Sequence, residues 1–259
     1  YPSYSSIYNS IVFESKRSNP GIAGLSASSA IYLLKLEDGS INKLDLYKGP
    51  AGVGLKEQHL PSFNKEGNIV SFMKYNDNTT RDYSLILYYL EKDSLEVLKN
   101  DVEHAEKFIW SPDDEKIFYD YLHSKTRRFP VFEVSINSVD VLDKMTRKII
   151  IADTNFNELG DVGNDKLLYV FYKSRFERHP VLRILDLESL TDIYTLNMYE
   201  LGFKQIKRPV FANDETVYFI GNPIEFEGAL GDDIYKLNLK TNEITRITNT
   251  ELMKEDLVY

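Results

Sequence analysis

The chain has 259 residues, of which 42% are hydrophobic and 13% aromatic, and this composition excludes a disordered or low-complexity polymer. With 31 Lys and Arg against 40 Asp and Glu, its formal net charge is −9, so it lacks the overall basic charge that nucleic-acid binding needs. It has no Cys, which excludes disulfides, thiolate catalysis and Cys-based zinc sites, and its apolar runs are too short to cross a bilayer. We therefore expect neither a nucleic-acid partner nor membrane insertion.

A short unit recurs along the chain: an aromatic residue or Val, then two to five turn-forming residues, then a run rich in Ile, Val, Tyr and Phe. The copies begin at the anchor residues Tyr4, Phe63, Trp110, Val162 and Phe211, which are spaced by 59, 47, 52 and 49 residues. Asp, Asn, Gly and Ser accept the dihedral angles of tight turns, and the run that follows suits a pleated, half-buried surface. Each unit is therefore predicted to be a β-hairpin.

A second hairpin follows each first one at a similar offset. Its copies cover residues 31–41, 85–95, 131–136 with a longer insertion up to 147, 181–190 and 234–244. Four strands per repeat of roughly 40 to 50 residues are typical of a β-propeller. Helical periodicity is missing outside one stretch near residues 139–148, which argues against a doubly wound α/β fold and a helical solenoid. An antiparallel sandwich is the structural alternative, but it does not explain a period near fifty residues.

The sequence thus predicts an all-β fold, a β-propeller of four-stranded antiparallel blades with five repeats and five or six blades. We expect a single domain over 1–259, with repeats at about 2–46, 57–102, 104–154, 155–198 and 200–251. Tyr259 falls 48 residues after Phe211, at the anchor position of a sixth repeat. Three alternatives stay open: a ring of five blades, a sixth blade outside this chain, or irregular strands between Leu44 and His59. The chain can also be a fragment of a longer one.

Residues 110–119, Trp-Ser-Pro-Asp-Asp-Glu-Lys-Ile-Phe-Tyr, resemble the W-S-P-D-G-x-x-I-x-F core of the WD40-like (PD40) repeat of the TolB family. Residues 31–39 and 234–239 are similar to the second half of that repeat, and 245–248 to its close. The copy at Val162 departs from the pattern because it lacks both the aromatic residue and the Pro. The resemblance implies a six-bladed propeller, a non-catalytic binding role and a periplasmic or extracellular location.

Propellers bind ligands at the mouth of the central channel, on loops that lead into the innermost strand of each blade. Here these loops are 57–61, 103–107, 155–158 and 204–208. Imidazoles and carboxylates there could ligate a metal or exchange protons, but such residues in exposed loops are usually only solvated. We expect no catalytic residue, no metal and no cofactor, and the candidate ligand-binding residues are Glu57, His59, Glu103, His104, Lys207 and Arg208.

The preferred function is a binding scaffold that docks a protein segment, a peptide or a small ligand at the channel mouth. One alternative is a glycosidase or lyase whose carboxylates, such as Glu57, Glu103 and Glu106, flank a sugar. Another is the regulatory propeller of a larger peptidase, since the chain has no G-x-S-x-G nucleophile motif of its own. Segments 76–78 and 231–233 could hold Ca²⁺, although neither has the spacing of an EF-hand loop.

Overall fold

The computed structural model of the chain is all-β in the residues that it describes. These are 2–15, 29–44, 58–75, 83–100, 107–124, 132–152, 156–172, 179–224 and 232–248, together with Val102 and Ala105. They form five four-stranded antiparallel sheets and contain no helix, so none that could span a membrane. The prediction of a β-propeller is confirmed, and the described residues make five blades.

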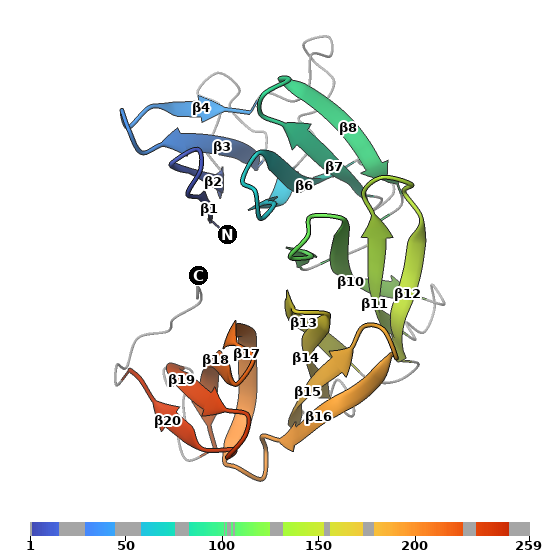
Figure 1. The fold of residues 1–259 in the computed structure, drawn as a ribbon, viewed down its shortest axis with the longest axis vertical. Helices are drawn as coiled ribbons and strands as arrows, with labels where there is room; N and C mark the ends of the chain where they lie inside the picture. The colour runs from blue at the N-terminus through green and yellow to red at the C-terminus, as the bar shows by residue number, and fades with distance from the viewer. Residues whose placement is uncertain are drawn as a thin grey trace, which may run out of the picture. The chain divides into compact units, whose positions relative to one another are not determined.

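In each sheet the strands are hydrogen-bonded in chain order, as Figure 1 shows for the first sheet. The first sheet contains β1 (Ser3–Ser5), β2 (Ser10–Ser15), β3 (Ala30–Lys35) and β4 (Ile41–Lys43). The second contains β5 (Gln58–Phe63), β6 (Ile69–Tyr75), β7 (Tyr83–Tyr89) and β8 (Ser94–Lys99). The third contains β9 (Phe108–Trp110), β10 (Lys116–Ser124), β11 (Phe132–Asp140) and β12 (Thr146–Ala152).

The fourth sheet contains β13 (Phe156–Gly163), β14 (Lys166–Tyr172), β15 (Pro180–Asp186) and β16 (Thr191–Asn197). The fifth contains β17 (Phe203–Asn213), β18 (Thr216–Pro223), β19 (Asp233–Asn238) and β20 (Ile244–Arg246). The chain divides into two compact units: unit 1 is Tyr1–Ile117 with Val139–Thr146, and unit 2 is Phe118–Ser138 with Arg147–Tyr259. Unit 1 holds the first two sheets, and unit 2 holds the last two.

The first hairpin of a blade forms where the sequence pattern predicts it. In the fifth sheet the anchor Phe211 pairs with Val217, and in the fourth Val162 pairs with Leu167. Asn164 and Asp165 both have positive φ, 46° and 58°, as a two-residue hairpin turn requires. The turn residues therefore fix the register of the strands on either side.

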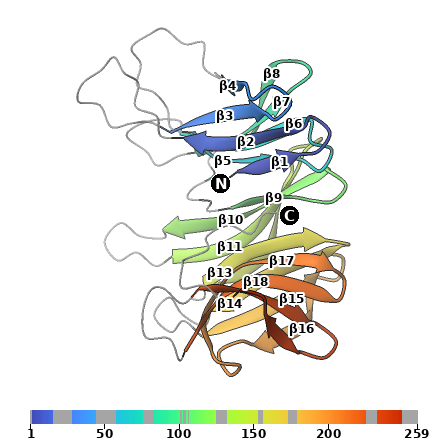
Figure 2. The ribbon, with the colours of Figure 1, turned by 90° about the vertical axis from the view of Figure 1, so that its left-hand side faces the viewer.

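Neighbouring blades of one unit bury their apolar faces against each other. In unit 2 one core joins the fourth and fifth sheets, which lie against one another in Figure 2. Its fully buried members include Leu168, Leu182 and Phe219. In unit 1, Trp110 is 2% exposed, and its indole N–H donates to Ser71 Oγ at 3.0 Å.

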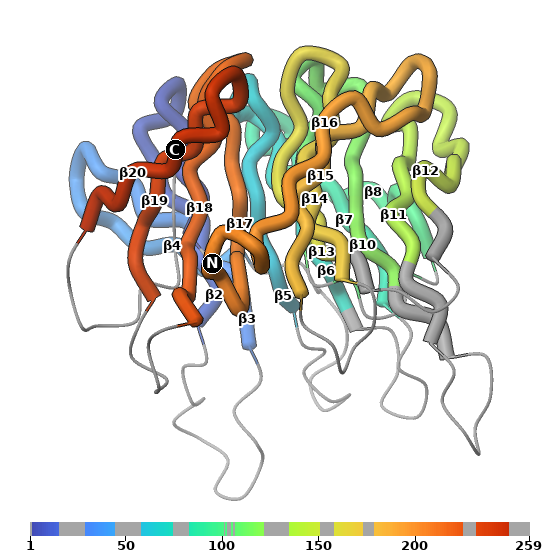
Figure 3. The backbone as a smooth tube through the Cα atoms, turned by 90° about the horizontal axis from the view of Figure 1, so that it is seen from below, coloured from blue at the N-terminus to red at the C-terminus, as the bar shows by residue number. Residues whose placement is uncertain are grey.

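Acidic residues at the hairpin tips tie adjacent blades together. In unit 1, Asp114 accepts three hydrogen bonds from the tip of the second sheet: from the Asn64 side chain at 2.8 Å and from the backbone N–H of Lys65 at 2.7 Å and Glu66 at 2.9 Å. Such contacts recur within a unit because the hairpin tips of its blades lie at the same end of the strands (Figure 3).

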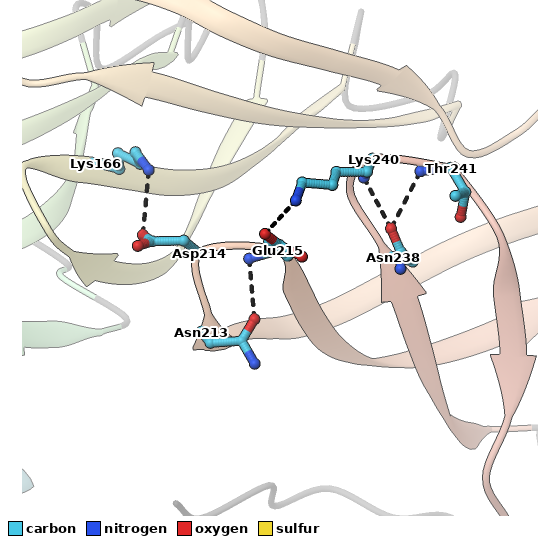
Figure 4. A network of polar contacts seen from close by, with 7 residues as sticks. All are labelled: Lys166, Asn213, Asp214, Glu215, Asn238, Lys240 and Thr241. Atoms are coloured by element: carbon cyan, nitrogen blue, oxygen red, sulfur yellow. Dashed lines mark hydrogen bonds and ion pairs between the residues drawn. The ribbon is translucent and has the colours of Figure 1, made fainter.

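The corresponding tip in unit 2 is Asp214, which accepts from Lys166 at 3.2 Å (Figure 4). It also accepts from Asn164 at 2.9 Å. These two contacts, that of Asn164 first, hold the pKa of Asp214 below its usual value. The next residue, Glu215, forms an ion pair with Lys240 of the outer hairpin. The tips thus connect both the neighbouring blades and the two hairpins of one blade.

Candidate functional site

The six predicted binding residues have different outcomes. Glu57, Glu103 and His104 lie outside the described residues, and so does Glu106 of the alternative carboxylate set. His59 lies on β5 in unit 1. Lys207 and Arg208 lie on β17 in unit 2. The structure therefore defines two separate candidate sites, one in each unit, and both lie on the first strand of a blade.

A β-bulge follows the candidate residue in both sites. The register of β5 with β6 shifts between His59 and Ser62, and the register of β17 with β18 shifts between Lys207 and Val210. His59 and Lys207 each lie four residues before the anchor of their blade. They are equivalent positions of the repeat, and bulges at such positions redirect side chains.

The residue after each candidate has an unusual backbone conformation. Leu60 has φ of 55° and Arg208 has φ of 50°, a region that bulky side chains rarely adopt. In both sites a glutamate binds the backbone N–H of this residue: Glu14 Oε2 accepts from Leu60 at 3.4 Å, and Glu158 Oε1 accepts from Arg208 at 3.5 Å. In each of the two sites, a glutamate therefore binds the N–H of the residue with positive φ.

In unit 1, His59 is bound by side chains from the first sheet. Its Nδ1 lies 2.9 Å from Glu14 Oε1 and 3.1 Å from the Oγ of Ser29, which is buried. The Tyr83 ring meets the imidazole edge-on, with centroids 6.4 Å apart. Burial raises the pKa of Glu14, but His59 and the Leu60 N–H outweigh burial and leave that pKa below its usual value.

This cluster has the residue types of a Ser-His-carboxylate triad but not its geometry. A triad needs the serine on one ring nitrogen and the carboxylate on the other. Here Ser29 and Glu14 both lie nearest to Nδ1, and Ser29 Oγ is 3.5 Å from Nε2. The contacts orient the imidazole, and they do not form a proton relay from Ser29 to Glu14.

In unit 2, Lys207 forms an ion pair with a carboxylate that the strand order brings beside it. Its Nζ lies 2.8 Å from Asp232 Oδ2, and the side chain of Asp232 is 3% exposed against 29% for Lys207. The other oxygen of Asp232 is buried and has no hydrogen-bond partner among the described residues, and the same holds for Oδ1 of Asn222 on β18. The buried part of this site therefore has unused hydrogen-bond acceptors.

Asp233, the next residue, has a structural role. It is fully buried, and its Oδ2 pairs with the Arg246 guanidinium, whose Nε lies 2.8 Å away. Its Oδ1 accepts from the Thr248 hydroxyl at 2.8 Å. Both oxygens of Asp233 are thus used to attach β20 to β19. Of the segment 231–233, a candidate calcium loop, residue 231 lies outside the described residues. Among the residues that the structure describes, no group of three or more His, Cys, Asp or Glu side chains could hold a metal ion.

Sequence reasoning missed Glu14, Ser29 and Asn222. It included Glu158 only as part of the loop 155–158, and it considered Asp232 only as a calcium ligand. One signal could have located the bulges. Pro61 and Pro209 both lie two residues before their anchors, and Pro inside a strand indicates an edge or a bulge because it has no N–H to donate. Aligning the repeats on their anchors would therefore have placed His59 and Lys207 at one position.

No protein-family model matches the chain, and no curated protein matches it by sequence. Solved structures do match its fold. A TolB protein from Agrobacterium tumefaciens has a TM-score of 0.65 at 11% identity, over 95% of this chain and 79% of that one. The β-propeller domain of the Trilobed protease from Pyrococcus furiosus has a TM-score of 0.66 at 16% identity, over 96% of this chain and 70% of that one.

An oligogalacturonate lyase in complex with manganese has a TM-score of 0.63 at 9% identity, over 95% of this chain and 64% of that one. The chain thus spans less than two thirds of the length of the lyase. At identities of 9% to 16% these likenesses establish the fold and not the activity. The chain has a TolB-like β-propeller fold, which it shares with a TolB protein, a lyase and the propeller domain of a protease.

Proposed function

We propose that the chain is a non-catalytic binding scaffold that docks a protein segment or a small ligand where the first strands of its blades begin. The observation that carries this proposal is the glutamate-capped bulge that follows both His59 and Lys207. A bulky residue at positive φ costs roughly 1–3 kcal/mol, and such strain concentrates at functional sites. Leu60 and Arg208 bear this cost at equivalent positions of two blades.

The strained backbone presents polar side chains that are already held in place. His59 is fixed by Glu14, and Lys207 by Asp232. A ligand that meets oriented side chains avoids part of the entropy loss of ordering them on binding. Rigid strands also hold a binding group more precisely than loops do.

The similarity to a lyase and to peptidase propellers raises the alternative of an enzyme. The geometry around His59 favours binding, because Glu14 and the shorter contact of Ser29 both fall on Nδ1, which is not the arrangement of a catalytic triad. The likeness to TolB supports a periplasmic or secreted location and a protein or peptide partner. The net charge of −9 argues against nucleic acid as a partner.

The experiment is a thermal-shift screen of the whole chain against a peptide array and a metabolite set, followed by titration of each hit. Two conservative variants are used. His59→Asn keeps a hydrogen-bond donor for Glu14, and Lys207→Arg keeps a cation for Asp232, but each changes the side chain that a ligand would meet. We expect at least a tenfold weaker Kd for the hits in one of these variants, about 1.4 kcal/mol.

The matched controls are Lys43→Ala in unit 1 and Lys236→Ala in unit 2, which change exposed lysines on strands without a bulge. Both should bind the hits as the parent chain does. Binding that is unchanged in both site variants would refute the proposed location. Mass-spectrometric detection of a product made from any hit would refute the non-catalytic role.

A further inference from the structure

We propose that Oδ1 of Asp232 and Oδ1 of Asn222 form a subsite for the hydroxyl groups of an uncharged saccharide or polyol. This inference rests on the proposed function, because it names the ligand chemistry for the Lys207 side of the scaffold. It is carried by two buried acceptor oxygens that have no partner in the described part of the chain, by their place in the sheet and by the charges around them.

The two side chains lie at the same end of neighbouring strands. The ladder between β18 and β19 ends with Gly221 opposite Asp233, and the next residue outward on each strand is Asn222 or Asp232. On the other side, Asn222 pairs with Gln205 of β17. Residues opposite each other point to the same face of a sheet, so Gln205, Asn222 and Asp232 present three polar side chains on one face.

Both orphaned oxygens are buried, since Asp232 is 2% and Asn222 is 8% exposed. Buried polar atoms in folded proteins nearly always have a hydrogen-bond partner, and two exceptions at one place indicate a missing donor. A carboxylate and an amide oxygen can only accept, so the ligand must supply the hydrogens.

The surrounding charges select the kind of donor. Lys207 already neutralises Asp232, and Arg246 neutralises Asp233. An ammonium or guanidinium ligand would therefore be repelled by the Lys207 ammonium and would find no unpaired carboxylate to offset that repulsion. Calcium takes six to eight oxygen ligands, far more than the two orphaned oxygens supply. Hydroxyl groups donate hydrogen bonds and carry no charge, so they supply the hydrogens that the two oxygens need without adding a charge to the site.

Access to the subsite runs along Lys207. Its side chain is 29% exposed, whereas its partner Asp232 is nearly closed to solvent. Lysine has a flexible four-carbon stem, so its ammonium can swing aside to admit a ligand and return to Oδ2 of Asp232, while a hydroxyl donates to Oδ1. The ligand then gains both Asp232 and Asn222 as acceptors.

The test uses the full chain and three sugars of one shape: glucose, glucosamine and glucuronate. Saturation-transfer NMR detects binding, and calorimetry measures affinity. We expect glucose to bind more tightly than its charged analogues. Asn222→Leu removes the acceptor and keeps the size of the side chain, and it should weaken the affinity for glucose at least tenfold. Lys236→Ala on the next strand should leave that affinity unchanged.

The same variant separates a ligand site from an internal hydrogen bond. If Asn222 Oδ1 is orphaned in the free protein, Asn222→Leu removes an unsatisfied group and the melting temperature stays equal or rises. A clearly lower melting temperature would mean that the Asn222 amide donates to Asp232, which overturns the proposal.

Preference for glucosamine or glucuronate would also overturn it, and so would binding of none of the three sugars. If none binds while screen hits still respond to His59→Asn or Lys207→Arg, the scaffold stands and only the subsite fails. Conversely, chemical conversion of bound glucose would refute the non-catalytic role and leave the subsite in place.

Discussion

Replacing Gly160 by Ala should disturb a close approach between the fourth and fifth blades. A Cβ at Gly160 would lie 2.7 Å from the Leu168 carbonyl oxygen, 2.7 Å from Pro209 Cγ and 3.0 Å from the Pro209 carbonyl oxygen. Two of these three atoms belong to the backbone and cannot turn away. Overpacking of this kind costs about 1–3 kcal/mol, so we expect Gly160→Ala to lower the stability of the protein by that amount.

The matched control is Gly163→Ala on the same strand. A Cβ there meets only Phe211 Cδ2 at 3.5 Å, an ordinary contact, and neither glycine has positive φ. This variant should be neutral or gain about 0.5–1 kcal/mol, because Ala has less freedom to lose than Gly. Urea unfolding followed by circular dichroism compares the two. In a chain of this size each kcal/mol corresponds to roughly 2–4 °C in melting temperature. Equal urea midpoints for the two variants would show that Gly160 is not packed closely against Leu168 and Pro209.

Three further predictions concern single polar contacts. Ser71→Ala leaves the buried indole N–H of Trp110 without an acceptor and should cost about 1–3 kcal/mol, measured by urea unfolding with the fluorescence of this sole Trp. Asp114→Ala removes three hydrogen bonds and should cost about 1–3 kcal/mol, against about 0.5 kcal/mol or less for its neighbour in Glu115→Ala; equal losses would contradict the role of the tip. The folded-state pKa of Glu14 is lowered, so its carboxylate stabilises the fold at neutral pH, and this contribution fades as the pH falls below the usual value of 4.5. The difference in unfolding free energy between the parent chain and Glu14→Gln should therefore become smaller as the pH falls from 7 to 3. A difference that grows over this range would show that the folded-state pKa of Glu14 is raised and not lowered.

The fold was predictable because its signals are local. A turn residue such as Asn164 and the alternating run after it lie within ten residues of each other, and they set a hairpin without reference to the rest of the chain. Because two hairpins recur in each repeat, the period then indicated four-stranded blades. Even the weakest copy, at Val162, pairs with Leu167 as predicted.

The contacts of the candidate site could not be read in the same way. Glu14 and His59 are 45 residues apart, and Lys207 and Asp232 are 25 residues apart. Which carboxylate reaches which cation depends on the bulges and on how the strands pack. The sequence predicted His59 and Lys207 from their place in the repeat, but not the acids that hold them.

The fourth repeat differs from the second and the fifth at the position two residues before its anchor, and this difference has a physical reason. The position two residues before the anchor is Pro61 in the second blade and Pro209 in the fifth, but Gly160 in the fourth. Because Pro209 of the next blade packs directly on Gly160, any larger side chain there would push that bulge away. The glycine at this position thus leaves room for Pro209 and for the bulge beside Lys207.

The two candidate sites use one backbone device with different side chains. The bulge, the residue at positive φ and the glutamate on its N–H are common to both, whereas the presented group is an imidazole in unit 1 and an ammonium in unit 2. If the bulge served packing alone, the presented positions would be expected to carry similar apolar residues. Instead each carries a polar group bound by a buried or half-buried acid. A constant frame with variable polar groups is the arrangement that selective binding requires, and this is the strongest structural reason to seek a ligand at the first strands of the blades.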